Sequence, residues 1–312
     1  MNRVTEEEHR PVLKDSVIEL LGIESNGRYV DATYGRGGHA QGILGRLGPQ
    51  GRLMVIDRDS DAIDAAKRLH GDDERVVIRH GAFSRLDEFV AEEGWSGAVD
   101  GVLFDLGVSS PQLDTPSRGF SFMNDGPLDM RMDIRSGQSA AQWLAEADEK
   151  EIAGIIFEYG EERFSRRIAR NIVRQREQQP LLSTSELAEL VKRSVPPRHD
   201  GKHPATKTFQ AIRIHVNDEL RQIRSALASA FDALTSGGRL AVISFHSLED
   251  RIVKQFMTRL VKGESLPAYI PVTGKQSGIK ARWVAKRVKP GAAEIESNPR
   301  ARSSVLRVVE AL

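Results

Sequence analysis

A short stretch near the start of the chain combines carboxylates with a cluster of glycines. Asp31 ends an apolar run and is followed by Gly35, Gly37 and Gly38, and Asp57 stands twenty positions after Gly37. Glycines at a turn let the backbone approach a ligand closely, and the first N–H groups of a following helix are free to bind it. A carboxylate at position 57 can accept hydrogen bonds from both hydroxyls of a ribose. The pattern predicts a nucleotide-type cofactor.

Two cofactor classes fit this stretch. The spacing of Gly35, Gly37 and Ala40 matches the dinucleotide fingerprint, so an NAD-dependent oxidoreductase is the alternative reading. Asp31, however, would repel a pyrophosphate and attract the sulfonium or amino group of S-adenosylmethionine (SAM). Asp105, which ends another apolar run, adds a further carboxylate. We therefore favour methyl transfer from SAM over hydride transfer.

The elements that must position these residues follow the pattern of an α/β fold. Helical periodicities alternate with short apolar runs, which is typical of a mostly parallel sheet. Because the carboxyl ends of parallel strands share one edge, Asp31, Asp57 and Asp105 are predicted to lie along it. The stretch 263–289 is predicted to be a loop. Strands are predicted at residues 28–31, 53–56, 76–78, 99–104, 239–245 and 303–309, and flanking helices at 11–21, 39–47 and 61–69.

The sheet is interrupted by a long insertion. The 134 positions from Asp105 to Arg239 exceed by roughly 90 to 100 residues what one crossover connection needs. Residues 1–112 and 208–312 are assigned to a cofactor-binding domain and residues 113–207 to an inserted helical domain. One long helix at 209–234 is predicted to return the chain to the sheet. Helices within the insertion are predicted at 139–147, 152–157, 164–176 and 184–195.

Composition and charge limit the remaining classes. The 312 residues include no cysteine, which excludes disulfides, thiolate metal sites and a cysteine nucleophile. No apolar run suggests a secretory signal or a spanning helix, so we expect a cytoplasmic protein without a membrane partner. Residues 1–150 carry 17 Lys and Arg against 27 Asp and Glu, a net charge of −10, and residues 151–312 carry 28 against 17, a net charge of +11. A basic half is suited to a polyanion, although surface charge is also uneven in many enzymes.

An arginine-rich helix lies in the insertion. Phe164, Ile168 and Ile172 recur every four positions and predict a buried stripe. The arginines largely off that stripe could contact RNA phosphates or form an ordinary solvated face, and the sequence leaves both readings open. These arginines are Arg163, Arg166, Arg167, Arg170 and Arg174, and the basic character continues at Arg193, Arg198, Lys202 and Lys207.

Seven sequence blocks together resemble the MraW-type methyltransferases, which methylate N4 of a cytosine in the decoding region of small-subunit (16S) ribosomal RNA. The blocks are residues 31–39, 105–112, 118–133, 159–163, 202–206, 244–251 and 298–304. The resemblance implies a class I SAM-dependent methyltransferase fold with a helical insertion, a substrate in the small ribosomal subunit and no catalytic metal. It leaves the oligomeric state open, with a dimer as one option. It places SAM contacts on Gly37, Gly38, His39, Asp57, Phe83, Asp105 and Gln112.

The chemistry at such a target suggests further residues. The lone pair of an exocyclic cytosine amine is delocalised into the ring, so an acceptor for N4–H should help the transfer. Asp105, Ser109 and Ser110 are the candidate acceptors. His246, at the end of a predicted strand, could act as a general base, since histidine titrates near neutral pH. Because the proton can also leave to solvent, a structural or substrate-positioning role for His246 is the alternative.

Aromatic residues could hold the two rings that meet in the reaction. Phe83, just after the third predicted strand, could face the adenine of the cofactor or be a core residue. Phe120, Phe122 and Phe245 are candidates for stacking on the target base, because unstacked bases bind aromatic side chains. Loop packing is the alternative for Phe120 and Phe122.

Three aspartates at four-residue intervals, Asp125, Asp129 and Asp133, could suggest a metal site. Their spacing matches no calcium loop. We expect a solvated or arginine-paired loop there instead.

Overall fold

The computed structural model describes residues 11–197, 203–263 and 278–312. The chain forms two compact units, one comprising Met1–Gly107 and Leu220–Leu312 and the other Val108–Glu219. The second unit therefore begins and ends outside the predicted 113–207. The reason is local packing, because Val108 and Leu113 at one end and Phe209 and Ile212 at the other contribute to its core.

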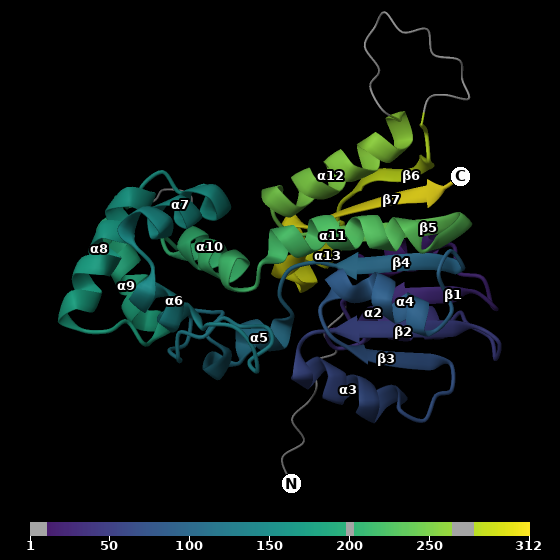
Figure 1. Ribbon diagram of the computed structural model, residues 1–312, viewed down its shortest axis with the longest axis horizontal. Helices are drawn as coiled ribbons and strands as arrows, with labels where there is room; N and C mark the ends of the chain where they lie inside the picture. Colours follow the sequence, from purple (N-terminus) through teal and green to yellow (C-terminus); the bar gives the residue numbers. More distant parts are fainter. Residues whose placement is uncertain (1–10, 198–202, 264–277) are drawn as a thin grey trace, which may run out of the picture. The chain divides into compact units, whose positions relative to one another are not determined.

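A seven-stranded sheet forms the centre of the first unit, with the order β3-β2-β1-β4-β5-β7-β6 (Figure 1). β7 runs antiparallel to both of its neighbours, while the other described pairs are parallel. The predicted mostly parallel α/β sheet is confirmed. The strands are β1 (Arg28–Asp31), β2 (Arg52–Asp57), β3 (Val76–His80), β4 (Val99–Asp105), β5 (Leu234–Ser244), β6 (Ala281–Val288) and β7 (Val305–Ala311).

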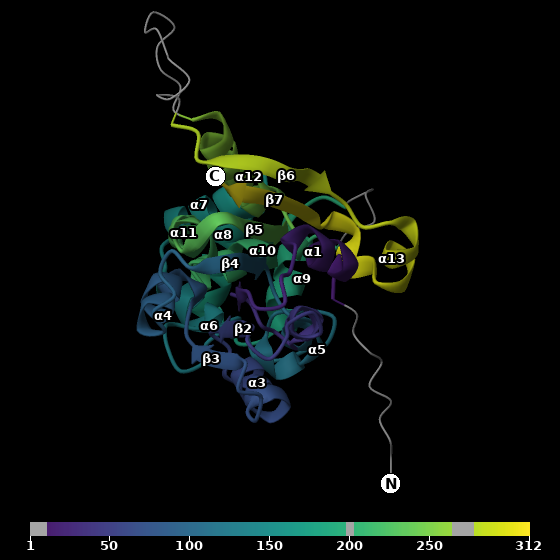
Figure 2. The same cartoon turned by 90° about the vertical axis from the view of Figure 1, so that its right-hand side faces the viewer.

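Helices cover both faces of this sheet. On one face, apolar residues of α1, α2 and α3 form a core with β1, β2 and β4 and with Leu306 and Val308 of β7. On the other face, the Arg307 side chain of β7 donates to the Asp250 carboxylate of α12 at 2.7 Å. Because successive side chains of a strand point to opposite faces, Arg307 lies on the face opposite to Leu306 and Val308. Helix α12 therefore covers that opposite face (Figure 2). The helices are α1 (Lys14–Leu21), α2 (Gly38–Leu44), α3 (Ser60–His70), α4 (Leu86–Glu92), α11 (Glu219–Asp232), α12 (Ser247–Lys262) and α13 (Ala292–Ser297), with 3-10 turns η1 (Phe83–Arg85) and η4 (Pro299–Ser303).

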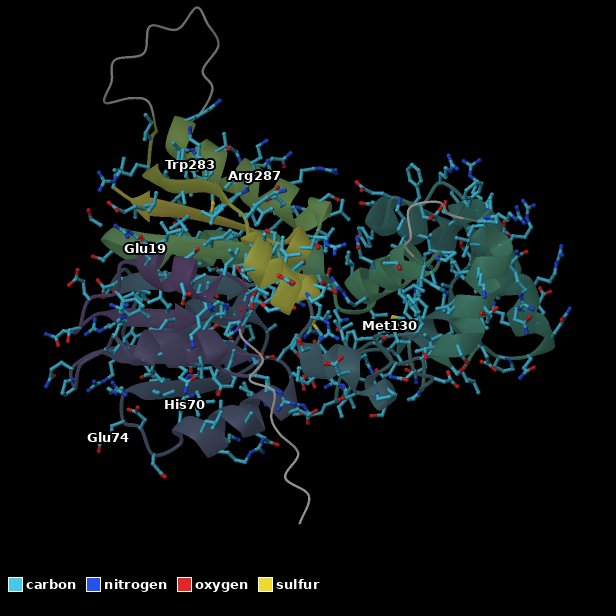
Figure 3. The ribbon with its side chains drawn as sticks, turned by 180° about the vertical axis from the view of Figure 1, so that it is seen from behind. Glu19, His70, Glu74, Met130, Trp283 and Arg287 are labelled. Carbon is cyan, nitrogen blue, oxygen red and sulfur yellow. The ribbon has the colours of Figure 1, made fainter. Side chains whose placement is uncertain are left out.

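Three predicted elements differ from the structure. The stretch read as a loop contains β6, on which Trp283 and Arg287 lie (Figure 3). The register of β6 against β7 is irregular, so its sequence lacks the alternation of apolar and polar residues by which a strand is normally recognised. The helix expected from residue 11 begins only at Lys14, because Leu13 adopts a left-handed conformation with φ of 55°.

The single long helix predicted at 209–234 is two helices, α10 (Thr206–Val216) and α11. Asp218, with φ of 51°, interrupts the helical backbone between them. The buried Asn217 amide accepts from Met132 N–H at 2.8 Å and donates to the Met130 carbonyl at 2.7 Å. The helical periodicity of the sequence is unbroken here and does not reveal the break. The break depends on hydrogen bonds to a loop 85 residues away.

The inserted unit is helical, as predicted. Its helices are α5 (Ser110–Asp114), α6 (Ala140–Glu146), α7 (Glu149–Gly160), α8 (Ser165–Gln178), α9 (Thr184–Ser194) and α10, with the 3-10 turn η2 (Pro116–Arg118). Ser139 and Ser183 begin α6 and α9 through capping boxes with Gln142 and Glu186. Among the described residues of the chain, no helix is both long and apolar enough to cross a lipid bilayer.

Candidate cofactor site

The carboxyl edge of the sheet gathers charged side chains that are largely shielded from water. Asp31 and His39 are only 1% and 5% exposed, and His39 Nε2 lies 3.6 Å from Asp105 Oδ2. Asp31 Oδ2, both ring nitrogens of His39 and Asp105 Oδ1 are buried without a hydrogen-bond partner. A buried polar atom left unsatisfied costs about 1–3 kcal/mol. Their concentration at one edge indicates a place where a polar ligand completes the hydrogen bonding.

The charges in this cluster are coupled. Burial raises the pKa of Asp31 to about 6, against the opposing effects of His39 and the Thr33 N–H group. Burial also disfavours the charged form of His39, but Asp105 and Asp31 outweigh it and raise the pKa of the imidazole. The cluster contains two carboxyl groups, Asp31 and Asp105, and only one imidazole, His39. Such a cluster favours a cationic ligand over a pyrophosphate.

Thr33 joins the tips of β1 and β4. Its Oγ1 accepts from Asp105 N–H at 2.6 Å, and its own N–H donates to Asp31 Oδ1 at 3.1 Å. This residue links the Asp31 carboxylate to the backbone of Asp105. No local feature of the sequence singles out Thr33, because its contact with Asp105 forms only when β1 and β4 lie side by side.

The glycine loop is shaped by the protein's own side chains. Gly37 has φ of 76°, and a Cβ there would lie 2.5 Å from the Tyr34 hydroxyl oxygen. A Cβ on Gly38 would lie 2.2 Å from Pro11 Cγ. Internal packing thus accounts for two glycines that the sequence suggested were needed for a ligand. Burial raises the pKa of Tyr34 to about 12, so its phenol stays neutral.

Asp57 occupies the predicted position at the end of β2. Its Oδ2 accepts from Gly35 N–H at 2.8 Å and its Oδ1 from Asp59 N–H at 2.9 Å. Burial raises the pKa of Asp57 to about 6 although these N–H groups oppose the rise. Each carboxylate oxygen can accept more than one hydrogen bond, so the group retains capacity for ribose hydroxyls.

Phe83 begins the 3-10 turn that follows β3 and is half-buried. Its ring meets Phe104 of β4 edge-on, with 5.7 Å between the centroids. This contact makes Phe83 part of the packing at the strand ends. A partly exposed ring in that position remains consistent with the predicted contact to adenine.

Ser109, Ser110 and Gln112 belong to the inserted unit. Ser109 precedes α5, and its N–H donates to Gln112 Oε1 at 3.0 Å in a capping box. These residues follow Gly107, the last residue of the first unit's opening segment, within five positions. Gln112 therefore has a structural role in α5, and its predicted contact with SAM stays a prediction, as does the acceptor role of the two serines.

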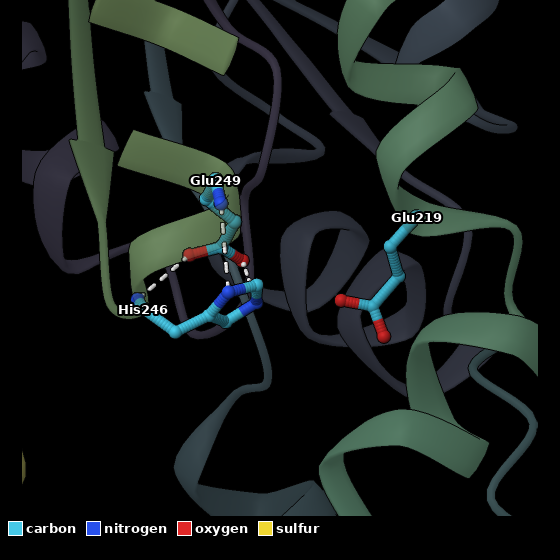
Figure 4. A group of neighbouring side chains, drawn as sticks. All are labelled: Glu219, His246 and Glu249. Atoms are coloured by element: carbon cyan, nitrogen blue, oxygen red, sulfur yellow. Dashed lines mark hydrogen bonds and ion pairs between the residues drawn. The ribbon is translucent and has the colours of Figure 1, made fainter. Parts of the chain in front are cut away.

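His246 is a capping residue of α12. Its Nδ1 faces Glu249 N–H at 3.5 Å, and its Nε2 lies 3.1 Å from Glu249 Oε1 (Figure 4). Glu249 is fully buried, and its Oε2 accepts from Phe245 N–H at 2.8 Å. Both ring nitrogens are thus directed at Glu249, which favours the structural alternative over a general base.

The three candidate stacking residues have different surroundings. Phe120 is buried in the core of the inserted unit, and Phe122 packs against His203 and Phe209 at centroid distances of 4.5 and 4.9 Å. Phe120 and Phe122 are therefore packing residues, which agrees with the alternative given for them above. Phe245 lies at the end of β5 beside Gly107, where an added Cβ would be 3.5 Å from its ring. Phe245 is therefore the best placed of the three beside the strand tips.

The three regularly spaced aspartates have protein partners. Asp129 holds Arg131 through two hydrogen bonds of 2.8 and 2.7 Å, and Asp133 holds Arg135 through two of 2.9 Å. Asp125 accepts from Ser185 N–H at 3.0 Å. The expectation of an arginine-paired loop is confirmed for Asp129 and Asp133.

The arginine-rich helix is α8, and its amphipathic arrangement is confirmed. Ile168 and Ile172 are fully buried in the core of the inserted unit. Arg170 lies 3.7 Å from Glu149, an exposed pair of the kind that contributes little to stability. Arg193 and Lys207 are also among the described residues, whereas Arg198 and Lys202 lie outside them. The exposed arginines are Arg163, which precedes α8, and Arg166, Arg167, Arg170 and Arg174 within it.

Comparisons with known proteins identify the family. The model of the MraW methylase family matches residues 6–312. The chain belongs to the MraW methylase family. It is 55% identical, over 97% of both chains, to the ribosomal RNA small subunit methyltransferase H of Thioalkalivibrio sulfidiphilus (strain HL-EbGR7).

Two solved structures also resemble the chain. One is a putative rRNA-methylase from Clostridium thermocellum, with 13% identity, 96% and 95% of the two chains covered and a TM-score of 0.45. The other is a putative methyltransferase from Streptococcus mutans in complex with SAH, with 12% identity, 96% and 97% covered and a TM-score of 0.44. Neither is close in sequence or in superposition.

Family membership settles the fold class and the cofactor class. The sheet described above is that of a class I SAM-dependent methyltransferase, and the oxidoreductase alternative is not supported. The residues present fit SAM, because the unpaired atoms of Asp31, His39 and Asp105 form an anionic cluster at the strand tips. Asp57, at the end of the neighbouring strand, has acceptor capacity for the ribose.

Proposed function

We propose that this protein transfers the methyl group of SAM to the exocyclic N4 of a cytidine in small-subunit (16S) ribosomal RNA. The observation that carries the proposal is the cluster of the buried Asp31 and His39 with the half-buried Asp105 in a chain of the MraW methylase family. The curated relative, named for small-subunit ribosomal RNA, supports the choice of substrate. The cytosine and its N4 atom follow from the family resemblance.

The chain's own residues would contribute mainly by binding and orientation. SAM supplies an electrophilic methyl group on a sulfonium that is already a good leaving group. Asp31 and Asp105 would hold the positive end at the strand tips, and Asp57 would hold the ribose. Fixing two reactants in line can contribute several kcal/mol to lowering the barrier.

The nucleophile requires a second set of contacts. The Asp105 carboxylate, with one oxygen unpaired, is the acceptor in the first unit for an N4 proton. Ser109 and Ser110, at the start of α5, are the further acceptors we propose. As the new N–C bond forms and the C–S bond breaks, one amine proton leaves to solvent or to such an acceptor. Phe245, beside Gly107, would stack on the target base.

The inserted unit would bind the RNA backbone. The exposed arginines of α8 offer guanidinium groups suited to phosphate oxygens. The same proposal includes 16S ribosomal RNA, free or within the small ribosomal subunit, as the partner and the cytoplasm as the location.

Nucleoside mass spectrometry of small-subunit ribosomal RNA tests this function directly. RNA from cells lacking the protein should lose a methyl group on N4 of one cytidine, and the wild-type gene should restore it. An Asp105→Asn gene should fail to restore it. Unchanged N4-methylcytidine in the deletion strain would rule out the proposed substrate.

A further inference from the structure

A hydrogen bond joins two segments that lie 281 positions apart in the chain. The Leu13 N–H group donates to Glu294 Oε1 at 2.6 Å, linking the residue before α1 to the helix α13. Figure 2 shows α13 beside the start of α1. Glu294 is half-buried, whereas Glu296 on the same helix is exposed.

The residue that donates this bond has a strained backbone. Leu13 has φ of 55° and ψ of 29°, a left-handed conformation that branched side chains rarely adopt. Its side chain is 3% exposed, and Val12 beside it is 6% exposed, so both are anchored in the core of the first unit. Such a conformation persists only where the surroundings hold it in place. The carboxylate of Glu294 is one such restraint, and it lies at the positive end of α1.

The same segment packs onto the glycine loop of the cofactor site. Pro11, two residues before Leu13, occupies the space into which a Gly38 Cβ would project, at 2.2 Å. Gly38 is followed directly by His39, whose ring nitrogens are unpaired in the cluster with Asp105. A continuous series of contacts therefore runs from Glu294 through Leu13 and Pro11 to Gly38.

We infer that Glu294 is a positioning residue for cofactor binding. By fixing Leu13 in its left-handed conformation, it holds Pro11 against Gly38 and so keeps the loop from Gly37 to His39 in its binding arrangement. Without the bond, Leu13 can relax to an ordinary conformation, and the loop loses its packing partner. This inference rests on the proposed use of SAM, and it assigns the far C-terminal part of the chain a role in the affinity for SAM.

Calorimetric binding of S-adenosylhomocysteine to the full-length protein tests the inference. Glu294→Ala should raise the dissociation constant about fivefold, the effect of losing about one hydrogen bond. Glu294→Gln retains an amide oxygen that can accept from Leu13 N–H, and it should restore most of the affinity. Glu296→Ala, on the same short helix, is the matched control and should bind like the wild type.

A second variant and a second measurement distinguish this positioning role from a general effect of Glu294 on folding stability. Pro11→Ala removes the ring that contacts Gly38 and should weaken binding in the same direction, even if Glu294→Ala proves too unstable to purify. Circular dichroism at the temperature of the titration confirms that each variant is folded. Wild-type affinity in folded Glu294→Ala or in Pro11→Ala would overturn the inference. Absence of binding by the wild type would instead contradict the proposed function.

Discussion

His39 Nε2 lies 3.6 Å from Asp105 Oδ2, at a distance where the two groups attract each other without forming a hydrogen bond. His39 is 5% exposed and both of its ring nitrogens lack a hydrogen-bond partner. The pair is therefore incompletely satisfied within the protein. With Asp31 it forms a site whose charges favour a cation, and this arrangement leads to the first two predictions.

Replacing Asp31 with asparagine should stabilise the protein in the absence of SAM. Exposed carboxyls titrate near 3.8, and burial raises the pKa of Asp31 to about 6. The unfolded state therefore loses this proton at lower pH than the folded state. The resulting destabilisation grows between pH 3.8 and about 6 and persists above it, with a magnitude of about 2–3 kcal/mol.

Urea unfolding at pH 7 measures this effect. Asp31→Asn should have a higher free energy of unfolding than the wild type, by about 1–3 kcal/mol, and a weaker affinity for SAM. Asp64→Asn, on the exposed face of α3, is the control and should change neither quantity. A variant that is less stable and still binds SAM normally would show that the Asp31 charge is not used for the ligand.

The affinity for SAM should depend on pH more strongly than the affinity for S-adenosylhomocysteine. Protonation of Asp31 and Asp57, whose pKa values are both raised to about 6, removes negative charge from the site as the pH falls. SAM carries a positive sulfur and its demethylated product a neutral one. Calorimetry at pH 7.5 and pH 5 should show a larger loss of affinity for SAM. Equal losses for the two compounds would mean that the sulfonium is not near these carboxylates.

Substitutions of His246 should distinguish capping from general base catalysis. Asparagine is a favourable cap, so His246→Asn should keep most of the stability and of the methyl transfer rate. His246→Ala should lose about 1 kcal/mol of stability, as is typical when a cap is removed. Thermal unfolding and single-turnover methyl transfer provide the readouts. A folded His246→Asn protein with at least a hundredfold lower transfer rate would restore the general base.

Reversing charges on α8 should weaken RNA binding without affecting SAM. With Arg166, Arg167 and Arg170 changed to Glu, the slope of log affinity against log salt should fall by about two to three, as expected for the loss of three phosphate contacts. Filter binding at several salt concentrations with small-subunit RNA measures the slope. Lys67→Glu with Arg68→Glu, on exposed positions of α3, is the control. If the three substitutions on α8 leave the slope unchanged, these arginines do not contact RNA phosphates.

Much of the first unit could be predicted because its strands are recognisable in the sequence as short apolar runs. β1 matches its predicted range, and β2, β3 and β4 differ by only one or two residues at their ends. Three of these strands end in Asp31, Asp57 and Asp105, so the parallel arrangement alone places the carboxylates along one edge. β6 could not be predicted, because its pairing with β7 shifts register twice and its residues do not alternate.

The finer structure of the site depends on tertiary contacts that no local pattern reveals. The sequence indicated that Gly37 and Gly38 leave room for a ligand. In the structure, the space that a Cβ atom would take is occupied by Tyr34 at Gly37 and by Pro11 at Gly38. The sequence left open whether His246 is a general base or a structural residue, and only the structure shows that both ring nitrogens face Glu249. Thr33 escaped notice because its role arises only when β1 and β4 lie side by side.

A crystal structure with S-adenosylhomocysteine bound is the most direct test of the central claim. The compound should lie across the tips of β1, β2 and β4, with its ribose at Asp57 and its sulfur near Asp31 and Asp105. Density for the compound at any other place, with these three tips unoccupied, would contradict the account.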